Sequence, residues 1–306
     1  MMADSNRRRA PAMKHRTALV FGVVIAAAVA VSAIPLQAQS FIPGAAGTEM
    51  VRNLRPSGQP VIPRFDGWYP NPDGSHGLCF GYFNLNLEEV LDIPLGPDNF
   101  IEPAEYDGMQ PTNFLPVPSR LDGLDRRYYC TFSATIPPGS ENERVVWTLR
   151  HDGETYSVPA HIGADDYKIE SPDQPGRNSV SPWVQFFDPS GPAGRGRDGD
   201  IIAGPVDVEA GMPLDLRISV VEPDTDNPNS GFERVLTIWT KHQGPGDVRF
   251  GSYEQTPVSG GVEASTTARF SAAGDYMLRL QAFEGGNPWG AQCCWTNAYV
   301  RVTVRP

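Results

Sequence analysis

The sequence predicts an all-β fold made of two β-sandwich-like domains, and three observations favour it. Apolar residues recur at every second position from Tyr276 to Ala282 and from Val300 to Val304, which is the period of a strand with one face in a core. The 31 Gly and 30 Pro among 306 residues break helices and separate short strands. Hydrophobic residues still make up 40% of the chain, enough to fill cores. We expect residues 267–304 to form antiparallel strands with a solvent side.

The clearest local signal in the first half of the chain is Asp152-Gly153, a two-residue turn that selects a hairpin. Counting outward from the turn pairs Leu149 with Tyr156 and Val145 with Ala160, and it places the apolar residues on one face. Further strands are expected at residues 78–83, 128–136, 214–220 and 235–241 from the same alternation.

Stretches rich in Gly and Pro suggest where the domains begin and end. A basic start, an apolar run over residues 18–34 and Ala38 predict a signal peptide at residues 1–38, with an uncleaved membrane anchor as the alternative. Residues 39–60 are expected to be a linker. A β-sandwich-like domain of unknown function follows at 61–189, then a second linker at 190–202 and a second sandwich at 203–306.

Charge restricts the partners. Removing residues 1–38 takes away five basic side chains and one acidic one, so the net charge changes from −11 to −15. Such a chain does not attract nucleic-acid phosphates or anionic lipids, and no membrane insertion is expected after signal cleavage. We therefore expect an exported protein, periplasmic or extracellular, whose partner is an envelope or extracellular protein or a glycan.

The four cysteines of an exported chain suggest disulfides. The simplest pairing joins Cys79 to Cys130, because both fall in expected strands of the first domain. Cys293 and Cys294 are neighbours, and a bridge between adjacent residues is strained. Either they form such a vicinal bridge, or one is a core residue and the other pairs elsewhere or stays free.

The second half carries a family resemblance. Its segments Asp224-Thr225-Asp226-Asn227-Pro228, Gly244-Pro245-Gly246-Asp247 and Gly274-Asp275-Tyr276-Met277-Leu278-Arg279-Leu280 resemble PKD-like and cadherin-like immunoglobulin-fold domains of bacterial surface proteins. The resemblance covers residues 203–306 and implies an immunoglobulin-like sandwich with Tyr276 as a tyrosine-corner residue. It implies adhesion, spacing or ligand binding in general terms. The first domain resembles segments of uncharacterised bacterial exported proteins.

Two candidate sites follow from the side chains of the second half. If the vicinal bridge forms, a stiff apolar platform for a sugar ring or an apolar ligand is expected from Trp289, Cys293, Cys294, Trp295 and Tyr299; otherwise Trp295 simply packs. Asp224, Asp226, Asn227 and Asn229 place oxygen ligands for Ca²⁺ in one loop, with a solvated loop as the alternative reading. No other cofactor is expected.

Catalytic motifs are missing from the sequence: there is no Gly-x-Ser-x-Gly elbow, zinc helix or phosphate-binding glycine loop. We therefore expect a non-catalytic binding or structural module of the bacterial envelope or extracellular space. A carbohydrate-binding protein that uses C-terminal aromatics is the second hypothesis. An enzyme acting on polysaccharide through carboxylates of the first domain is the third.

Overall fold

The computed structural model describes residues 55–116, 127–163, 165–170, 181–187, 190–221, 235–252, 254–255, 262–284 and 295–306. Among them, all regular structure is β-strand except two short 3-10 turns, η1 (Ala104–Tyr106) and η3 (Asp165–Tyr167). Within this part of the chain no helix combines the length and hydropathy that a membrane span requires. The expected signal peptide lies outside the described residues. The all-β prediction is confirmed.

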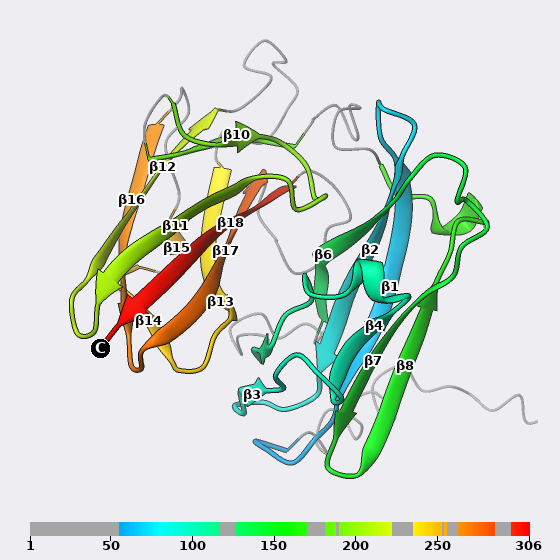
Figure 1. Ribbon diagram of the computed structural model, residues 1–306, viewed down its shortest axis with the longest axis horizontal. Coiled ribbons are helices and arrows are strands. Elements are labelled where there is room, and N and C mark those ends of the chain that lie inside the picture. Colours follow the sequence, from blue (N-terminus) through cyan, green and yellow to red (C-terminus); the bar gives the residue numbers. More distant parts are fainter. Residues whose placement is uncertain are drawn as a thin grey trace, which may run out of the picture. The chain divides into compact units, whose positions relative to one another are not determined.

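Two three-stranded antiparallel sheets form what we call the N-terminal lobe, the described residues from 55 to 170 (Figure 1). One sheet has the order β1–β2–β6 and the other β4–β7–β8, while β3 and β5 pair as a separate ribbon. The strands are β1 (Val61–Pro70), β2 (His76–Asn84), β3 (Leu91–Asp92), β4 (Asn99–Glu102), β5 (Asn113–Phe114), β6 (Arg127–Ile136), β7 (Val145–His151) and β8 (Glu154–Ala160).

Aromatic rings fill the core of this lobe. Phe80 of β2 stacks on Phe132 of β6 with ring centroids 5.2 Å apart, and Trp147 of β7 meets Phe132 edge-on at 5.1 Å. All three side chains are fully buried. Rings in these offset and edge-on arrangements add to the free energy gained by burying their apolar area, so they join the two sheets into one sandwich.

The β7–β8 hairpin has the predicted register. Leu149 pairs with Tyr156 and Val145 with Ala160. Asp152 and Gly153 have φ angles of 51° and 80°, so both central residues of the turn lie in the left-handed region, as a two-residue turn of this twist requires.

Two five-stranded sheets form the immunoglobulin-like lobe, the described residues from 181 to 306. One sheet has the order β10–β9–β12–β16–β14 and the other β11–β18–β17–β13–β15. The strands are β9 (Trp183–Phe186), β10 (Ala193–Gly194), β11 (Ile202–Glu209), β12 (Leu214–Val221), β13 (Val235–Gln243), β14 (Val248–Phe250), β15 (Glu254–Gln255), β16 (Val262–Phe270), β17 (Gly274–Glu284) and β18 (Trp295–Arg305).

The pairing pattern of this lobe is that of an immunoglobulin sandwich. Strand β9 runs antiparallel to β12, the chain then crosses to the other sheet, and β11 runs parallel to the last strand, β18. The Tyr276 hydroxyl donates a hydrogen bond of 2.8 Å to the carbonyl oxygen of Ala272 in the turn before β17. The predicted tyrosine corner is therefore present.

Strands β9 and β10 bear on the expected domain limits. Both precede residue 203, yet β9 pairs with β12 of the second sandwich and β10 pairs with β9. Residues 54–306 also form one unit by their internal contacts. The division at residues 189 and 203 therefore stays a prediction.

Both faces of β17 and β18 are buried over residues 277–283 and 295–300, which corrects the expected solvent side there, whereas Asp275, Arg301 and Arg305 at the other end of these strands are exposed as expected. Even-numbered residues such as Leu280 and Val300 face the core of the immunoglobulin-like lobe, as the alternation predicts. The opposite face carries Arg279, Asn297 and Tyr299, with exposures of 4%, 0% and 0%. The reason is tertiary, because this face packs against the β1–β2–β6 sheet of the N-terminal lobe.

Candidate functional site

Few of the sequence-predicted site residues lie in the described part of the chain. Trp289, Cys293 and Cys294 lie outside the described residues, as do Asp224, Asp226, Asn227 and Asn229. Trp295 and Tyr299 are described, with exposures of 2% and 0%. Both side chains pack between the lobes, which agrees with the alternative in which Trp295 simply packs. The platform as a whole stays a prediction, because its other three residues lie outside the described part of the chain.

The predicted disulfide joins Cys79 of β2 to Cys130 of β6, with Cα atoms 4.9 Å apart. Both cysteines are buried, with exposures of 0% and 1%. Tyr69 and, from the other lobe, Phe283 and Trp295 belong to the same apolar cluster. The bridge therefore lies on the face of the β1–β2–β6 sheet that meets the immunoglobulin-like lobe.

Strand β6 bulges at Cys130. Phe80 pairs with Phe132 and Tyr82 with Tyr128, so three residues of β6 oppose Gly81 alone. The φ angle of Cys130 is 42°. A bulge removes backbone groups from the ladder, and buried backbone groups need other partners.

Side chains from both lobes provide these partners. The Cys130 N–H donates to the Asp66 carboxylate at 2.7 Å. The Cys130 carbonyl accepts from the Asn297 amide at 2.8 Å, and the Thr131 carbonyl accepts from the Tyr299 hydroxyl at 3.0 Å. The bulge is thus where the two lobes exchange hydrogen bonds.

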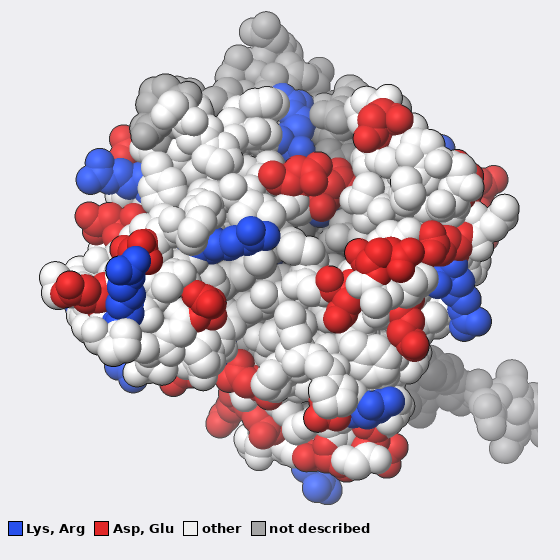
Figure 2. Space-filling view, in the orientation of Figure 1, with Lys and Arg blue, Asp and Glu red and all other residues white. Residues whose placement is uncertain are grey.

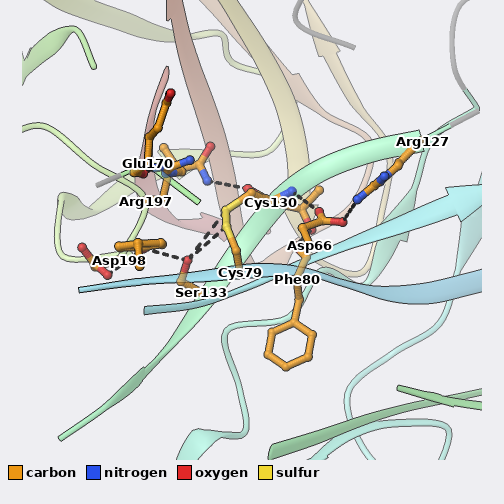
Figure 3. Close-up of a disulfide and its surroundings, with 12 residues drawn as sticks. Asp66, Cys79, Phe80, Arg127, Cys130, Ser133, Glu170, Arg197 and Asp198 are labelled. Atoms are coloured by element: carbon orange, nitrogen blue, oxygen red, sulfur yellow. Dashed lines mark hydrogen bonds and ion pairs between the residues drawn. A yellow bond between two sulfur atoms is a disulfide. The ribbon is translucent and has the colours of Figure 1, made fainter. Parts of the chain in front are cut away.

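Asp66 is held by a neighbouring cation. Arg127 donates a hydrogen bond to the Asp66 carboxylate (Figure 3). The Asp66 side chain is only 4% exposed. Burial raises the pKa of Asp66, and the Arg127 guanidinium opposes that rise. Both oxygens of this carboxylate are therefore bonded at the bulge, one by Arg127 and the other by the Cys130 N–H.

Arg279 extends the network from the other lobe. Its Nε and Nη2 atoms donate to the Asn297 Oδ1 atom at 3.1 and 2.8 Å. Burial lowers the pKa of the Arg279 guanidinium. Asn297 therefore accepts from a buried cation and donates to the bulge at the same time.

A second polar group lies on the other side of the disulfide, around Arg197 and Asp198 (Figure 3). The Arg197 guanidinium lies 4.9 Å from the ring centroid of Tyr69 and 4.9 Å from that of Trp295. The Tyr69 hydroxyl donates to Asp198 at 2.7 Å. Burial raises the pKa of Asp198, and burial together with Asp198 raises that of Tyr69. These contacts bind the segment before β11 to β1 of the N-terminal lobe.

An open groove on the N-terminal lobe differs from these buried groups. It has a volume of about 710 Å³ and lies between β1, β2, β8 and η3. Aromatic rings line it, namely Phe65, Phe83 and Tyr167, together with Arg64 and His161. A concave, mainly apolar site with a few polar groups is the usual form of a small-ligand site.

Sequence reasoning did not find this groove. Its residues come from four separate segments, and none forms a recognisable motif. The available signal was Tyr167, an aromatic residue directly after the charged pair Asp165-Asp166, and it is 50% exposed.

The described residues contain no group of three or more His, Cys, Asp or Glu side chains arranged to hold a metal ion. The predicted calcium loop lies outside that part of the chain, so this finding does not bear on it.

Figure 2 shows acidic side chains spread in several groups over the face in view, with fewer basic ones.

Comparison with known proteins identifies no family. No protein-family model and no curated protein matches the chain. Among solved structures, domains 4 and 5 of the S-layer protein SbsC are 11% identical over 54% of this chain and 66% of that one, with a TM-score of 0.23. The D0-D1 domain of intimin is 8% identical over 80% and 98%, with a TM-score of 0.23.

A longer SbsC structure, residues 31-844, is 14% identical over 81% of this chain and 28% of its own length, with a TM-score of 0.22. The chain thus spans less than two thirds of both S-layer structures. At these scores the likeness assigns neither ligand nor role.

Proposed function

We propose that this chain is a non-catalytic, exported binding or structural module of the bacterial envelope or extracellular space. The observation that carries the proposal is the contrast between the buried carboxylates and the side chains that line the open groove. The buried carboxylate of Asp66 is bonded within the bulge of β6, and that of Asp198 is bonded to Tyr69 of the other lobe, whereas the open groove presents aromatic rings and a guanidinium. Such a division favours binding over bond cleavage.

Export is supported by the disulfide together with the N-terminal pattern. Disulfides persist in oxidising compartments and are rare where thiols are kept reduced. Cys79 and Cys130 form a buried bridge, and residues 1–38 have the composition of a signal peptide. Mass spectrometry of the mature protein from its native host tests export: cleavage after residue 38 and an intact bridge are expected, and a reduced cytosolic form with residues 1–38 retained would contradict it.

Carbohydrate binding is the second candidate, and the groove now supports it better than the C-terminal aromatics do. Tyr167 is half exposed, whereas Trp295 and Tyr299 are buried. The third hypothesis, a polysaccharide-cleaving enzyme, needs two carboxylates in an open cleft. The residues lining this groove include no Asp or Glu.

A retention assay separates these functions. Purified residues 39–306 are incubated with peptidoglycan and a panel of insoluble polysaccharides, and both retained protein and released soluble sugar are measured. Retention lost in Tyr167→Ala and kept in Trp183→Ala supports carbohydrate binding, because Trp183 is an exposed aromatic (39%) outside the groove. Release of sugar would replace the proposal with an enzyme. Absence of both retention and release would leave a protein-contacting or spacer role.

A further inference from the structure

The groove lies between two sheet edges that do not favour an added strand. β1 pairs only with β2 among the described strands, and β8 only with β7, so each is an edge of its sheet. Both carry a proline at the groove, Pro63 on β1 and Pro159 on β8. Proline has no N–H to donate, so an extended peptide gains fewer backbone hydrogen bonds here. The groove is better suited to a ligand that stacks than to one that adds a strand.

Tyr167 provides the stacking surface. Its ring lies nearly parallel to that of Phe65, with centroids 5.6 Å apart and an interplanar angle of 12°. This contact fixes the ring while 50% of the residue stays exposed. A rigid aromatic face pairs with a flat, weakly polar surface, and the C–H face of a pyranose ring is one.

Arg64 provides a positive charge in the lining of the groove. Its guanidinium lies 5.0 Å from the Phe83 centroid, and that of Arg127 lies 5.9 Å from the same centroid. The nearby carboxylate, Asp66, is bound by Arg127. No ion pair of Arg64 occurs in the described part of the chain.

The lining of the groove contains no carboxylate, although Asp66 interacts electrostatically with Arg64 from β1. His161 lines the groove and adds a second hydrogen-bonding group. Asp165 and Asp166 precede Tyr167 on η3, but they are exposed and do not line the groove. In a chain of net charge −11, a guanidinium set among aromatic rings with no lining carboxylate is complementary to an anionic ligand.

We propose that the groove binds an acidic glycan of the uronic-acid type, with a pyranose ring stacked on Tyr167 and its carboxylate paired with Arg64. The inference rests on the proposed binding function and narrows its ligand. Aromatic stacking and a planar guanidinium together recognise the two features that distinguish such a sugar, its C–H face and its carboxylate.

The test is a calorimetric titration of residues 39–306 with tetramers of galacturonic acid and of alginate uronic acids. The carboxyl-reduced tetramers and an acidic peptide that contains tyrosine serve as competing ligands. We expect binding of at least one uronate tetramer and its loss on carboxyl reduction. Because the charge pair is open to solvent, binding is expected to weaken as salt rises.

Two variants with matched controls locate the contact. Arg64→Gln is expected to weaken binding about tenfold or more, as loss of a charge-assisted hydrogen bond implies. Arg150→Gln is its control, since Arg150 also lies over a ring, that of Phe100, but outside the groove. Tyr167→Ala is compared with Trp183→Ala in the same way. Thermal melting of every variant shows that it remains folded.

The results distinguish acidic-glycan binding at the groove from the alternatives. Equal binding of the reduced tetramers would overturn the acidic specificity while leaving glycan binding in place. Binding of the peptide alone would replace the glycan by a protein partner. Binding unaffected by Arg64→Gln would place the site elsewhere, and no binding of any probe by folded protein would overturn both the inference and a ligand-binding function for the groove.

Discussion

Replacing Asn297 by Ala removes the side chain that joins the two lobes at the bulge of β6. Its Oδ1 atom accepts two hydrogen bonds from Arg279, and its amide donates to the Cys130 carbonyl. Asn297 is fully buried and Arg279 is 4% exposed, so solvent does not replace these contacts. The substitution leaves a buried cation and a buried carbonyl without these partners.

The expected cost follows from those two losses. A hydrogen bond to a charged group contributes about 1.5–3 kcal/mol, and an unsatisfied buried carbonyl costs about 1–3 kcal/mol. We therefore expect the free energy of unfolding to fall by about 2.5–6 kcal/mol, a large share of the roughly 5–15 kcal/mol typical of a folded domain. Urea unfolding at pH 7, followed by tryptophan fluorescence, measures it.

Asn297→Asp and Thr303→Ala complete the test. The aspartate offers Arg279 a carboxylate but cannot donate to Cys130, so it is expected to be less destabilising than alanine. Thr303 lies on the same strand and bonds Asp275 at an exposed position, so its replacement is expected to cost within about 0.5 kcal/mol. A cost below about 1 kcal/mol for Asn297→Ala, or a greater cost for Asp than for Ala, would refute the reasoning.

Three further perturbations test other parts of the fold. Burial lowers the pKa of His242 to about 3, whereas the same side chain in the unfolded state has its ordinary pKa of 6.5. The unfolded state therefore binds more protons, and the stability of the protein falls as the pH drops from about 6.5 to 3. Melting curves of His242→Gln should show a shallower fall over this pH range. Gly81→Ala places a Cβ against the Tyr128 carbonyl oxygen, so loss of folded protein or a much lower melting temperature is expected by circular dichroism. Tyr276→Phe removes the bond to Ala272 and should cost about 1 kcal/mol in urea unfolding, whereas an unchanged midpoint would dismiss the corner's contribution.

Local pattern was sufficient for the long alternating strands and their core-facing residues, but it did not predict β1, β4, β9 or β11. The β7–β8 register followed from Asp152-Gly153 because a two-residue turn fixes which residues pair, and alternation then fixes their faces. The pairing of Cys79 with Cys130 was also within reach, since both fall in strands of one lobe and two strands that pair bring such residues together.

The candidate sites were less predictable, because they depend on which surfaces meet. Trp295 and Tyr299 look like surface aromatics in the sequence, yet they lie between the lobes. The groove gathers Arg64 and Tyr167 from segments about a hundred residues apart, and no local pattern encodes that approach.

The sequence by itself determined an all-β chain, the register of the β7–β8 hairpin and the core-facing residues of the strands it predicted, because side-chain alternation acts within one strand and its neighbour. Only the tertiary structure decided the fate of the outer face of β17 and β18. Arg279 and Asn297 are polar residues at positions that read as solvent-facing, and they are buried because the bulge at Cys130 supplies backbone groups that need hydrogen-bond partners. Packing of the two lobes against each other satisfies those backbone groups. Such long-range packing leaves no periodic pattern in the sequence.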